Sequence, residues 1–351
     1  MELAQPFQLK LFSVILPLQT TACMIDIFRR FNPLNIIWLA VLLFILRAGY
    51  VLFAPAAIPL QLTEPFVRTL IPVTYASTLA PTISVLLAAG VVLIQAVLVN
   101  YLINYYNLLG RPSFLPALMY VTLSGLFTPF LVLSAPLLCN FVIIWMLFKL
   151  LELYKTDESK SLAFDLGMLV ATGSLIYLPF TYLMAAAWVA LIIFRPFDWR
   201  DWAAGFIGYV TVFFFIGVIY YLTDRLPYLY QIWLPLGSSF KLPQVLDKYD
   251  LILLIPVALI IILGTFKLQE NFFKSYVLIR KAFQLLFFIV LIAALSFYVR
   301  PEFGLSHFLL CTVPVAIFFA YYFLYAGKRW VYETLFFLLI ASIIYFQFNN
   351  F

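Results

Sequence analysis

Two carboxylates in this sequence are each followed closely by an arginine: Glu64 by Arg68, and Asp224 by Arg225. A carboxylate can act as a general base, and an arginine binds phosphate through paired N–H donors. An enzyme acting on a polyprenyl-phosphate-linked sugar or another lipid needs both groups. Glu64 and Asp224 are therefore the candidate catalytic residues, and Arg68 and Arg225 are candidates for binding its substrate.

The string Arg-Pro-Phe-Asp-Trp-Arg-Asp-Trp at residues 195–202 is the most distinctive in the chain. Arg195, Asp198 and Arg200 are candidate substrate contacts, because alternating charges can hold a phosphate. The favoured interpretation is structural: proline and tryptophan suit a cytoplasmic turn pressed against lipid headgroups, with the charges pairing locally.

Three further candidate binding residues lie in or beside apolar runs. An arginine near the centre of a span costs about 2.5–3.5 kcal/mol on insertion scales. Arg47 lies about two-thirds of the way along such a run, so it should face other helices or reach toward the interface. If Arg47 lines a water-filled cavity, it is a binding residue of a small-solute transporter. Asn100 and Asn104 are four residues apart, on one face of a helix. Such amides more often bond to neighbouring helices than to a substrate.

Other kinds of chemistry have little support in the sequence. Cys23, Cys139 and Cys311 lack metal-ligand spacing, and His307 is the only histidine, so we expect no metal site. There is no Walker motif, Gly-rich dinucleotide fingerprint, His-Glu-x-x-His motif or nucleophile elbow, so no cofactor is predicted. The Lys and Arg residues form no long basic run, so nucleic acid is not an expected partner.

The elements that must position these residues follow from composition. The chain has 351 residues, of which 66% are hydrophobic and 10% charged, and its mean hydropathy is +1.07. Soluble domains are about 45–50% apolar and about 25% charged. Too few polar side chains are present to cover a globule in water, so the expected partner of most of the surface is the lipid bilayer. We predict an all-α bundle of transmembrane helices, because the long apolar runs lack the alternation of barrel strands.

About eleven apolar runs approach the roughly 20 residues that a spanning helix needs. With a cytoplasmic N-terminus, most of the 21 Lys and Arg residues fall on the cytoplasmic side, as the positive-inside rule requires. Pro179 divides the run 162–194 into two spans joined by a tight outer turn. Asp165 and Glu333 fall near inner ends of spans, where a helix N-terminus favours a carboxylate. The predicted spans are 36–53, 81–102, 114–133, 135–151, 162–178, 179–194, 203–222, 251–266, 282–299, 306–325 and 330–348.

One transmembrane domain is expected over residues 24–351. Residues 1–23 contain an apolar stretch too short to span. Met24 opens a short basic and aromatic lead-in to the first span, so we interpret residues 1–23 as a dispensable extension, with either Met1 or Met24 as the start.

At residues 104–109, 194–202 and 328–333 the chain resembles an uncharacterised family of bacterial polytopic inner-membrane proteins, a domain of unknown function. These stretches read Asn-Tyr-Tyr-Asn-Leu-Leu, Phe-Arg-Pro-Phe-Asp-Trp-Arg-Asp-Trp and Lys-Arg-Trp-Val-Tyr-Glu. The likeness covers most of the chain from Met24 onward. Many family members have Glu where Asp201 stands, which argues against a strict catalytic role there. The resemblance implies a bacterial membrane protein and no mechanism.

Three functions remain open, in this order. The first is a non-enzymatic scaffold or partner subunit of a cell-envelope assembly in the inner membrane, favoured by dispersed polar residues and missing motifs. The second is the membrane enzyme acting on a polyprenyl-phosphate-linked sugar or lipid, and the third is the small-solute transporter. Possible partners are thus another membrane protein or a lipid-linked substrate, and the expected location is the bacterial cytoplasmic membrane.

Overall fold

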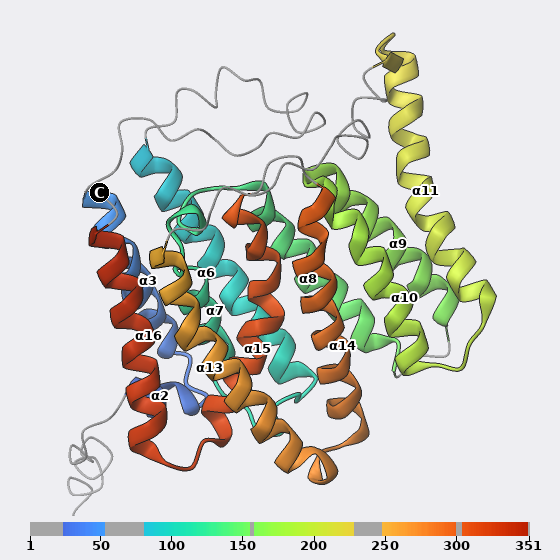
Figure 1. The fold of residues 1–351 in the computed structure, drawn as a ribbon. Helices are drawn as coiled ribbons and strands as arrows, with labels where there is room; N and C mark the ends of the chain where they lie inside the picture. The colour runs from blue at the N-terminus through green and yellow to red at the C-terminus, as the bar shows by residue number, and fades with distance from the viewer. Residues whose placement is uncertain (1–23, 53–80, 155–157, 228–247, 300–303, 350–351) are drawn as a thin grey trace, which may run out of the picture.

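A computed structural model of the chain describes residues 24–52, 81–154, 158–227, 248–299 and 304–349. Within these ranges the structure is helical and contains no β-strand (Figure 1). The predicted all-helical fold is confirmed, while a count of about eleven spans and a cytoplasmic N-terminus stay predictions. Among the described residues, seven helices are long and apolar enough to cross a membrane, by length and composition. They are α3 (Asn35–Leu52), α6 (Pro81–Tyr105), α8 (Ala135–Glu152), α11 (Trp199–Leu222), α13 (Lys248–Asn271), α14 (Val277–Leu295) and α15 (Leu309–Tyr325).

The remaining elements include the pair predicted on either side of Pro179. α9 and α10 are separate helices that pack against each other, and the chain between them turns through a 3-10 segment containing Pro179. The predicted break is confirmed, since proline lacks the N–H that a continuous helix requires. These elements are α2 (Met24–Arg29), α7 (Leu115–Leu123), η1 (Thr128–Phe130), α9 (Ser159–Ile176), η2 (Leu178–Tyr182), α10 (Leu183–Phe194), η4 (Phe272–Lys274), η5 (Ser296–Val299), η6 (Leu305–Phe308) and α16 (Arg329–Asn349).

The prediction of one helix across residues 114–133 is wrong. α7 has 9 residues, all of them buried, and at 1.5 Å per residue it is about 14 Å long, half of a bilayer core. The chain then leaves the helix through Ser124 and Gly125 and forms only the short η1 turn, which contains Pro129. Non-helical backbone is tolerated at membrane depth only where protein or a cavity surrounds it. The burial of α7 meets this condition.

α15 is the central helix of the bundle. Nearly all of its residues are buried, and α7, α8, α13 and α14 pack around it. Two arginines bind the carbonyl groups at its C-terminal end: Arg29 donates to Phe323 from Nε (3.0 Å) and Nη2 (2.7 Å), and Arg111 donates to Leu324 (2.6 Å). Cations at this end of a helix are favoured by its dipole. These contacts attach α2 and the α6–α7 connection to the central helix.

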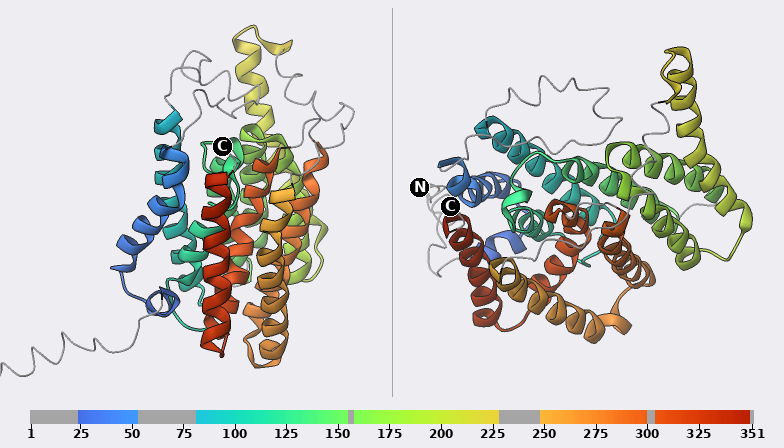
Figure 2. Two further views of the ribbon diagram at one scale, coloured as in Figure 1. Left: turned by 60° about the vertical axis from the view of Figure 1, so that its left-hand side comes forward. Right: turned by 45° about the horizontal axis from the view of Figure 1, so that its top comes forward.

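α11 lies at the edge of the bundle beside α9 (Figures 1 and 2). Three glycines, Gly167 on α9 with Gly205 and Gly208 on α11, let the two backbones approach closely. This is the small-residue packing that drives helix association in membranes. The opposite face of α11 carries exposed apolar side chains such as Phe206 and Phe214, as expected for a surface in contact with lipid.

Candidate functional site

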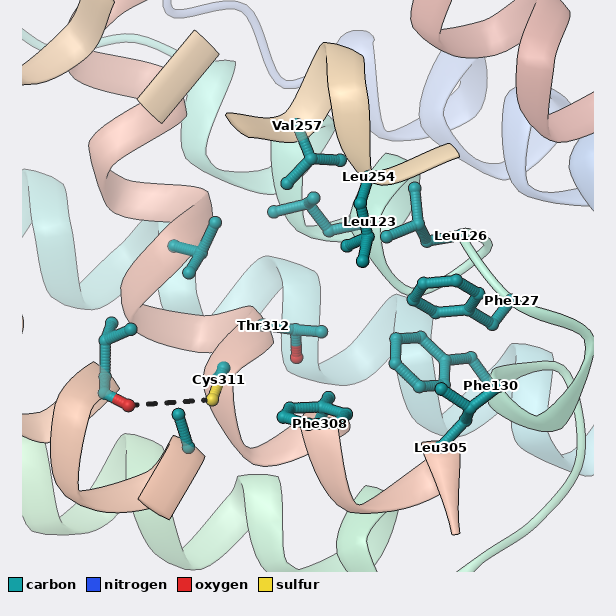
Figure 3. A pocket seen from close by; sticks show the side chains of 13 residues that line it. Leu123, Leu126, Phe127, Phe130, Leu254, Val257, Leu305, Phe308, Cys311 and Thr312 are labelled. Carbon is teal, nitrogen blue, oxygen red and sulfur yellow. Dashed lines mark hydrogen bonds between the residues drawn. The ribbon is translucent and has the colours of Figure 1, made fainter. Parts of the chain in front are cut away.

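An apolar cavity of about 290 Å³ lies between α7, α13, α14 and α15 (Figure 3). Its walls combine the end of α7 and the chain after it, one face each of α13 and α14, and η6 with the first turns of α15. The lining residues include Leu123, Phe127, Phe130, Leu254, Phe308 and Cys311. The site is therefore built from segments that are far apart in the sequence.

The arrangement of the helices explains why the cavity exists. α13 and α14 both pack on α15, but they diverge from their junction, with α15 between them (Figure 1). α7 stops at Leu123, so no helix continues into this space. Leu254 lines the cavity and is 37% exposed. The cavity thus reaches the outer, apolar surface of the bundle between α13 and α14.

The described part of the cavity wall offers no free hydrogen-bonding group to a ligand. Of the described lining side chains, only two carry a heteroatom, and both are already bonded: Thr312 donates to the carbonyl oxygen of Leu309 (2.6 Å), and the Cys311 thiol lies 3.8 Å from the carbonyl oxygen of Val290. The latter contact is drawn in Figure 3. Polar groups fix the orientation of most small-molecule ligands, so this wall selects for apolar matter.

A buried polar network lies behind the cavity wall at Thr312. The Tyr120 hydroxyl donates to Gln95 Oε1 (2.7 Å) and accepts from Asn140 Nδ2 (3.0 Å), which also donates to Thr312 (3.2 Å). Gln95 Nε2 in turn donates to the carbonyl oxygen of Leu137 (2.7 Å). The network joins α6, α7, α8 and α15. Its members were not among our candidates, because isolated polar residues in apolar runs have no distinguishing spacing.

Arg47, on α3, forms a hydrogen bond with the chain between α7 and α8. It is 2% exposed, and its Nη1 donates to the carbonyl oxygens of Leu131 (2.6 Å) and Val85 (3.4 Å). Leu131 follows the cavity-lining Phe130 directly. Neighbouring residues of the interrupted segment therefore contact the apolar cavity and a buried guanidinium. The idea that Arg47 lines a water-filled cavity stays a prediction.

Asn104 stabilises the turn after α6. Its Nδ2 donates to the carbonyl oxygens of Asn100 (2.8 Å) and Ser113 (3.0 Å), and its Oδ1 accepts from the Ser113 N–H (3.0 Å). Asn107 lies beyond the end of α6 with a left-handed φ of 49°, which Asn tolerates better than most residues. Asn100 is buried, and its Oδ1 has no partner. These amides lie toward the other end of α6 from Val85, which Arg47 of α3 contacts, so no shared binding site follows from them.

The string at residues 195–202 forms the corner between α10 and α11. Asp198 is the N-cap of α11 and accepts a hydrogen bond from the Arg200 N–H (3.0 Å). Asp201 is buried and accepts from the Ser159 hydroxyl (3.0 Å). Arg195 Nε donates to the carbonyl oxygen of Leu153 (3.4 Å), whereas the Arg200 side chain is exposed. Apart from Arg200, each charged group has a structural partner, as capping and helix docking require.

The proposed carboxylate and arginine pairs are not assembled by the described structure. Glu64 and Arg68 lie outside the described residues. Asp224 and Arg225 follow the end of α11, where Asp224 has a φ of 54° and the Arg225 N–H donates to the carbonyl oxygen of Tyr220 (2.8 Å). α11 packs on α9 and α10 and does not line the cavity. Asp224 and Arg225 therefore do not line the apolar cavity.

The interpretation of Asp165 and Glu333 as helix N-terminal carboxylates is wrong. α9 and α16 have no acidic residue in their first turns. Asp165 forms an ion pair with Lys149 of α8 (3.0 Å), and Glu333 pairs with Arg329 one turn earlier. Side-chain charges thus compensate both carboxylates.

His307 is a buried connection between three elements. Its Nε2 lies 2.8 Å from the carbonyl oxygen of Ala293 and its Nδ1 lies 2.9 Å from the Tyr177 hydroxyl. Because a carbonyl can only accept, we assign the proton to Nε2, so that Nδ1 accepts from Tyr177. A histidine with both nitrogens engaged in this way links η6 to α14 and to the α9–α10 turn.

A family model described as a family of unknown function (DUF6427) matches residues 57–351. The chain therefore belongs to this family, and the predicted resemblance to an uncharacterised family is confirmed. Among curated proteins and among solved structures, none matches the chain.

Proposed function

We propose that this member of the DUF6427 family is a multi-pass membrane protein that holds one hydrocarbon chain of a lipid or lipid-linked molecule inside its helix bundle. The observation that carries the proposal is the apolar cavity of about 290 Å³ between α7, α13, α14 and α15. An engineered apolar cavity of about half this volume binds benzene in a soluble protein.

The cost of an empty cavity supports an occupant. An apolar cavity of about 290 Å³ leaves its lining side chains without partner atoms on one side, which forfeits dispersion contacts. Water gains nothing by entering, because a buried water needs two or more polar partners. A bilayer supplies hydrocarbon chains at the lateral opening beside Leu254, and such a chain recovers the lost dispersion contacts without a polar group on the wall.

The membrane placement rests on composition and on the exposed helix faces. We infer about eleven crossings with a cytoplasmic N-terminus, because that arrangement keeps most Lys and Arg residues on one side. Exposed apolar side chains along α3, α11 and α13 support contact with lipid. The bacterial cytoplasmic membrane, and a place in the cell envelope, are proposals from the sequence.

Among the three roles considered from the sequence, a partner subunit that binds lipid agrees best with this site. A chain-binding cavity also suits an enzyme for lipid-linked substrates, but neither Asp224 nor Arg225 lines it. A small-solute transporter needs polar groups along its path, which this cavity lacks. The partner role predicts co-purification with another membrane protein in mild detergent. A chain recovered repeatedly as a solitary monomer contradicts that role.

The cavity is tested by filling it. Ala294 on α14 lines the cavity, so Ala294→Phe places a ring where the hydrocarbon chain is proposed to lie. Leu291 is on the same helix, is 44% exposed and does not line the cavity, so Leu291→Phe is the matched control. A fatty acid with a photoactivatable diazirine in mid-chain should label the peptide around Cys311 in the wild type and in the control, and label Ala294→Phe much less. Equal labelling of all three proteins would refute the chain site.

A further inference from the structure

Arg47 has a buried guanidinium with one nitrogen bonded to the described part of the chain. Nη1 donates to the carbonyl oxygens of Leu131 and Val85, whereas Nε and Nη2 are buried and have no hydrogen-bond partner among the described residues. The Nε–H and one Nη2–H point the same way from one edge of the planar group. This edge is one of the two through which arginine binds a carboxylate or phosphate with two parallel hydrogen bonds.

Among the described residues, the charge of Arg47 also has no counter-charge. In the parts of the chain that the structure describes, no carboxylate forms an ion pair with it. Arginine stays protonated in proteins, and an uncompensated buried charge costs several kcal/mol. An anion at the free edge removes this cost, and hydrogen-bonds the two unused donors.

The surroundings of Arg47 favour an anion independently of the arginine itself. Val85 belongs to the first turns of α6, and Leu131 lies just before α8, so Arg47 is bonded beside the N-terminal ends of two helices. Ser84 and Ser134 lie on the same two segments, and both have a buried hydroxyl without a partner. Ser134 is the N-cap residue of α8, yet its hydroxyl caps no backbone N–H. Helix N-termini attract anions through their dipole and free N–H groups.

We propose that the free edge of Arg47, with the N-terminal ends of α6 and α8, binds an oxyanion: a phosphate, supplied either by a lipid headgroup or as free phosphate. Arg47 supplies two charge-assisted hydrogen bonds, and the hydroxyls of Ser84 and Ser134 are the further donors on the adjoining segments. The site differs from the hydrocarbon-chain cavity, which Arg47 does not line. Either proposal can therefore fail without the other.

Binding of lipid is measured on the purified full chain by native mass spectrometry, with phosphatidylglycerol and phosphatidylcholine titrated separately. Binding of inorganic phosphate is measured by thermal unfolding of the same chain in phosphatidylcholine nanodiscs. Losing two charged hydrogen bonds lowers affinity by about tenfold or more. We expect Arg47→Gln to show this loss. Arg30→Gln removes an exposed arginine that is not among the candidate contacts and should bind as the wild type does.

The two sources of phosphate give different results. Preference for phosphatidylglycerol that disappears in Arg47→Gln identifies the lipid headgroup, and stabilisation by inorganic phosphate that disappears in the same variant identifies free phosphate. If Arg47→Gln does not fold, Arg47→Lys and Ser134→Ala replace it, since Lys keeps the charge without the two-donor edge. Affinities equal to those of the wild type in these variants, or no response to either anion, would overturn the proposal.

Discussion

Replacing Gly167 by alanine tests the close contact that holds α11 to α9. A Cβ at this position would lie 1.9 Å from the carbonyl oxygen of Gly205 and 2.8 Å from the backbone nitrogen of Tyr209. Real Cβ atoms stay at least 3.0 Å from such neighbours. α11 must therefore move outward by more than about 1 Å, which close-packed helices do not absorb locally.

The expected loss of unfolding free energy is at the upper end of the range for overpacked sites. Inserting a methyl group into a packed site costs typically about 1–3 kcal/mol, and side-chain rotation usually limits the cost. Here both opposing atoms are backbone, so no rotation relieves the contact. We expect Gly167→Ala to lower the free energy of unfolding by about 3 kcal/mol. Because the far face of α11 is exposed, few other described contacts remain to keep this helix in place.

The measurement is a titration from mild detergent into dodecyl sulfate, followed by tryptophan fluorescence. Trp202 at the start of α11 stacks on Trp188 of α10 at 5.6 Å, so the signal reports on the attachment of α11. Gly90→Ala in α6 is the control, because a Cβ there meets nothing within 4 Å and alanine favours a helix by up to about 1 kcal/mol over glycine. If Gly167→Ala unfolds at the same denaturant fraction as Gly90→Ala, the close backbone contact is not what holds α11.

Two further substitutions test the centre and one end of the bundle in the same titration. Arg29→Gln removes charged hydrogen bonds to the end of α15 and a guanidinium 4.2 Å above the Tyr332 ring, so it should cost about 1.5–3 kcal/mol; full stability with Gln would contradict the capping role. Tyr120→Phe leaves Gln95 Oε1 without its donor and removes an acceptor from Asn140, so it should cost about 1–3 kcal/mol. The exposed Tyr105→Phe should change little, and an equal loss from both tyrosines would contradict the network.

Much of the fold is predictable because its signals are local. The span predicted at 135–151 is found as α8 over Ala135–Glu152, and the break at Pro179 occurs where predicted. Both signals lie within one stretch of sequence. A run of apolar residues can be recognised as long enough to cross a bilayer, and a proline lacks the N–H that a continuous helix uses. The ion pair that compensates Asp165 escaped prediction because its partner, Lys149, is on another helix.

α7 shows where hydropathy stops being informative. Residues 114–133 are apolar enough to resemble a span, but hydropathy does not separate a helix that faces lipid from an apolar segment enclosed by protein. The same holds for the cavity, whose lining residues individually resemble ordinary core residues. The acceptors of Arg47 are backbone carbonyls of Val85 and Leu131. Because every residue type carries a carbonyl, the sequence does not indicate which residues accept from Arg47.

The interruption after α7 links both candidate sites to one property of the chain. A helix that ends inside a bundle leaves carbonyl groups without intrahelical partners, and hydrocarbon cannot satisfy them. At the end of α7, the N–H groups of Ser124 and Gly125 donate to the carbonyl oxygens of Tyr120 and Thr122. In the non-helical chain beyond, Arg47 binds the carbonyl oxygen of Leu131, and Gln347 of α16 approaches that of Gly125 (3.5 Å). Arg47 is thereby held beside the starts of α6 and α8 with one edge unused. On the other side, the missing helical turns leave room that Leu126, Phe127 and Phe130 only partly occupy. A continuous helix through residues 124–134 would remove the need for Arg47 and fill the cavity together, so the two features depend on the same broken element.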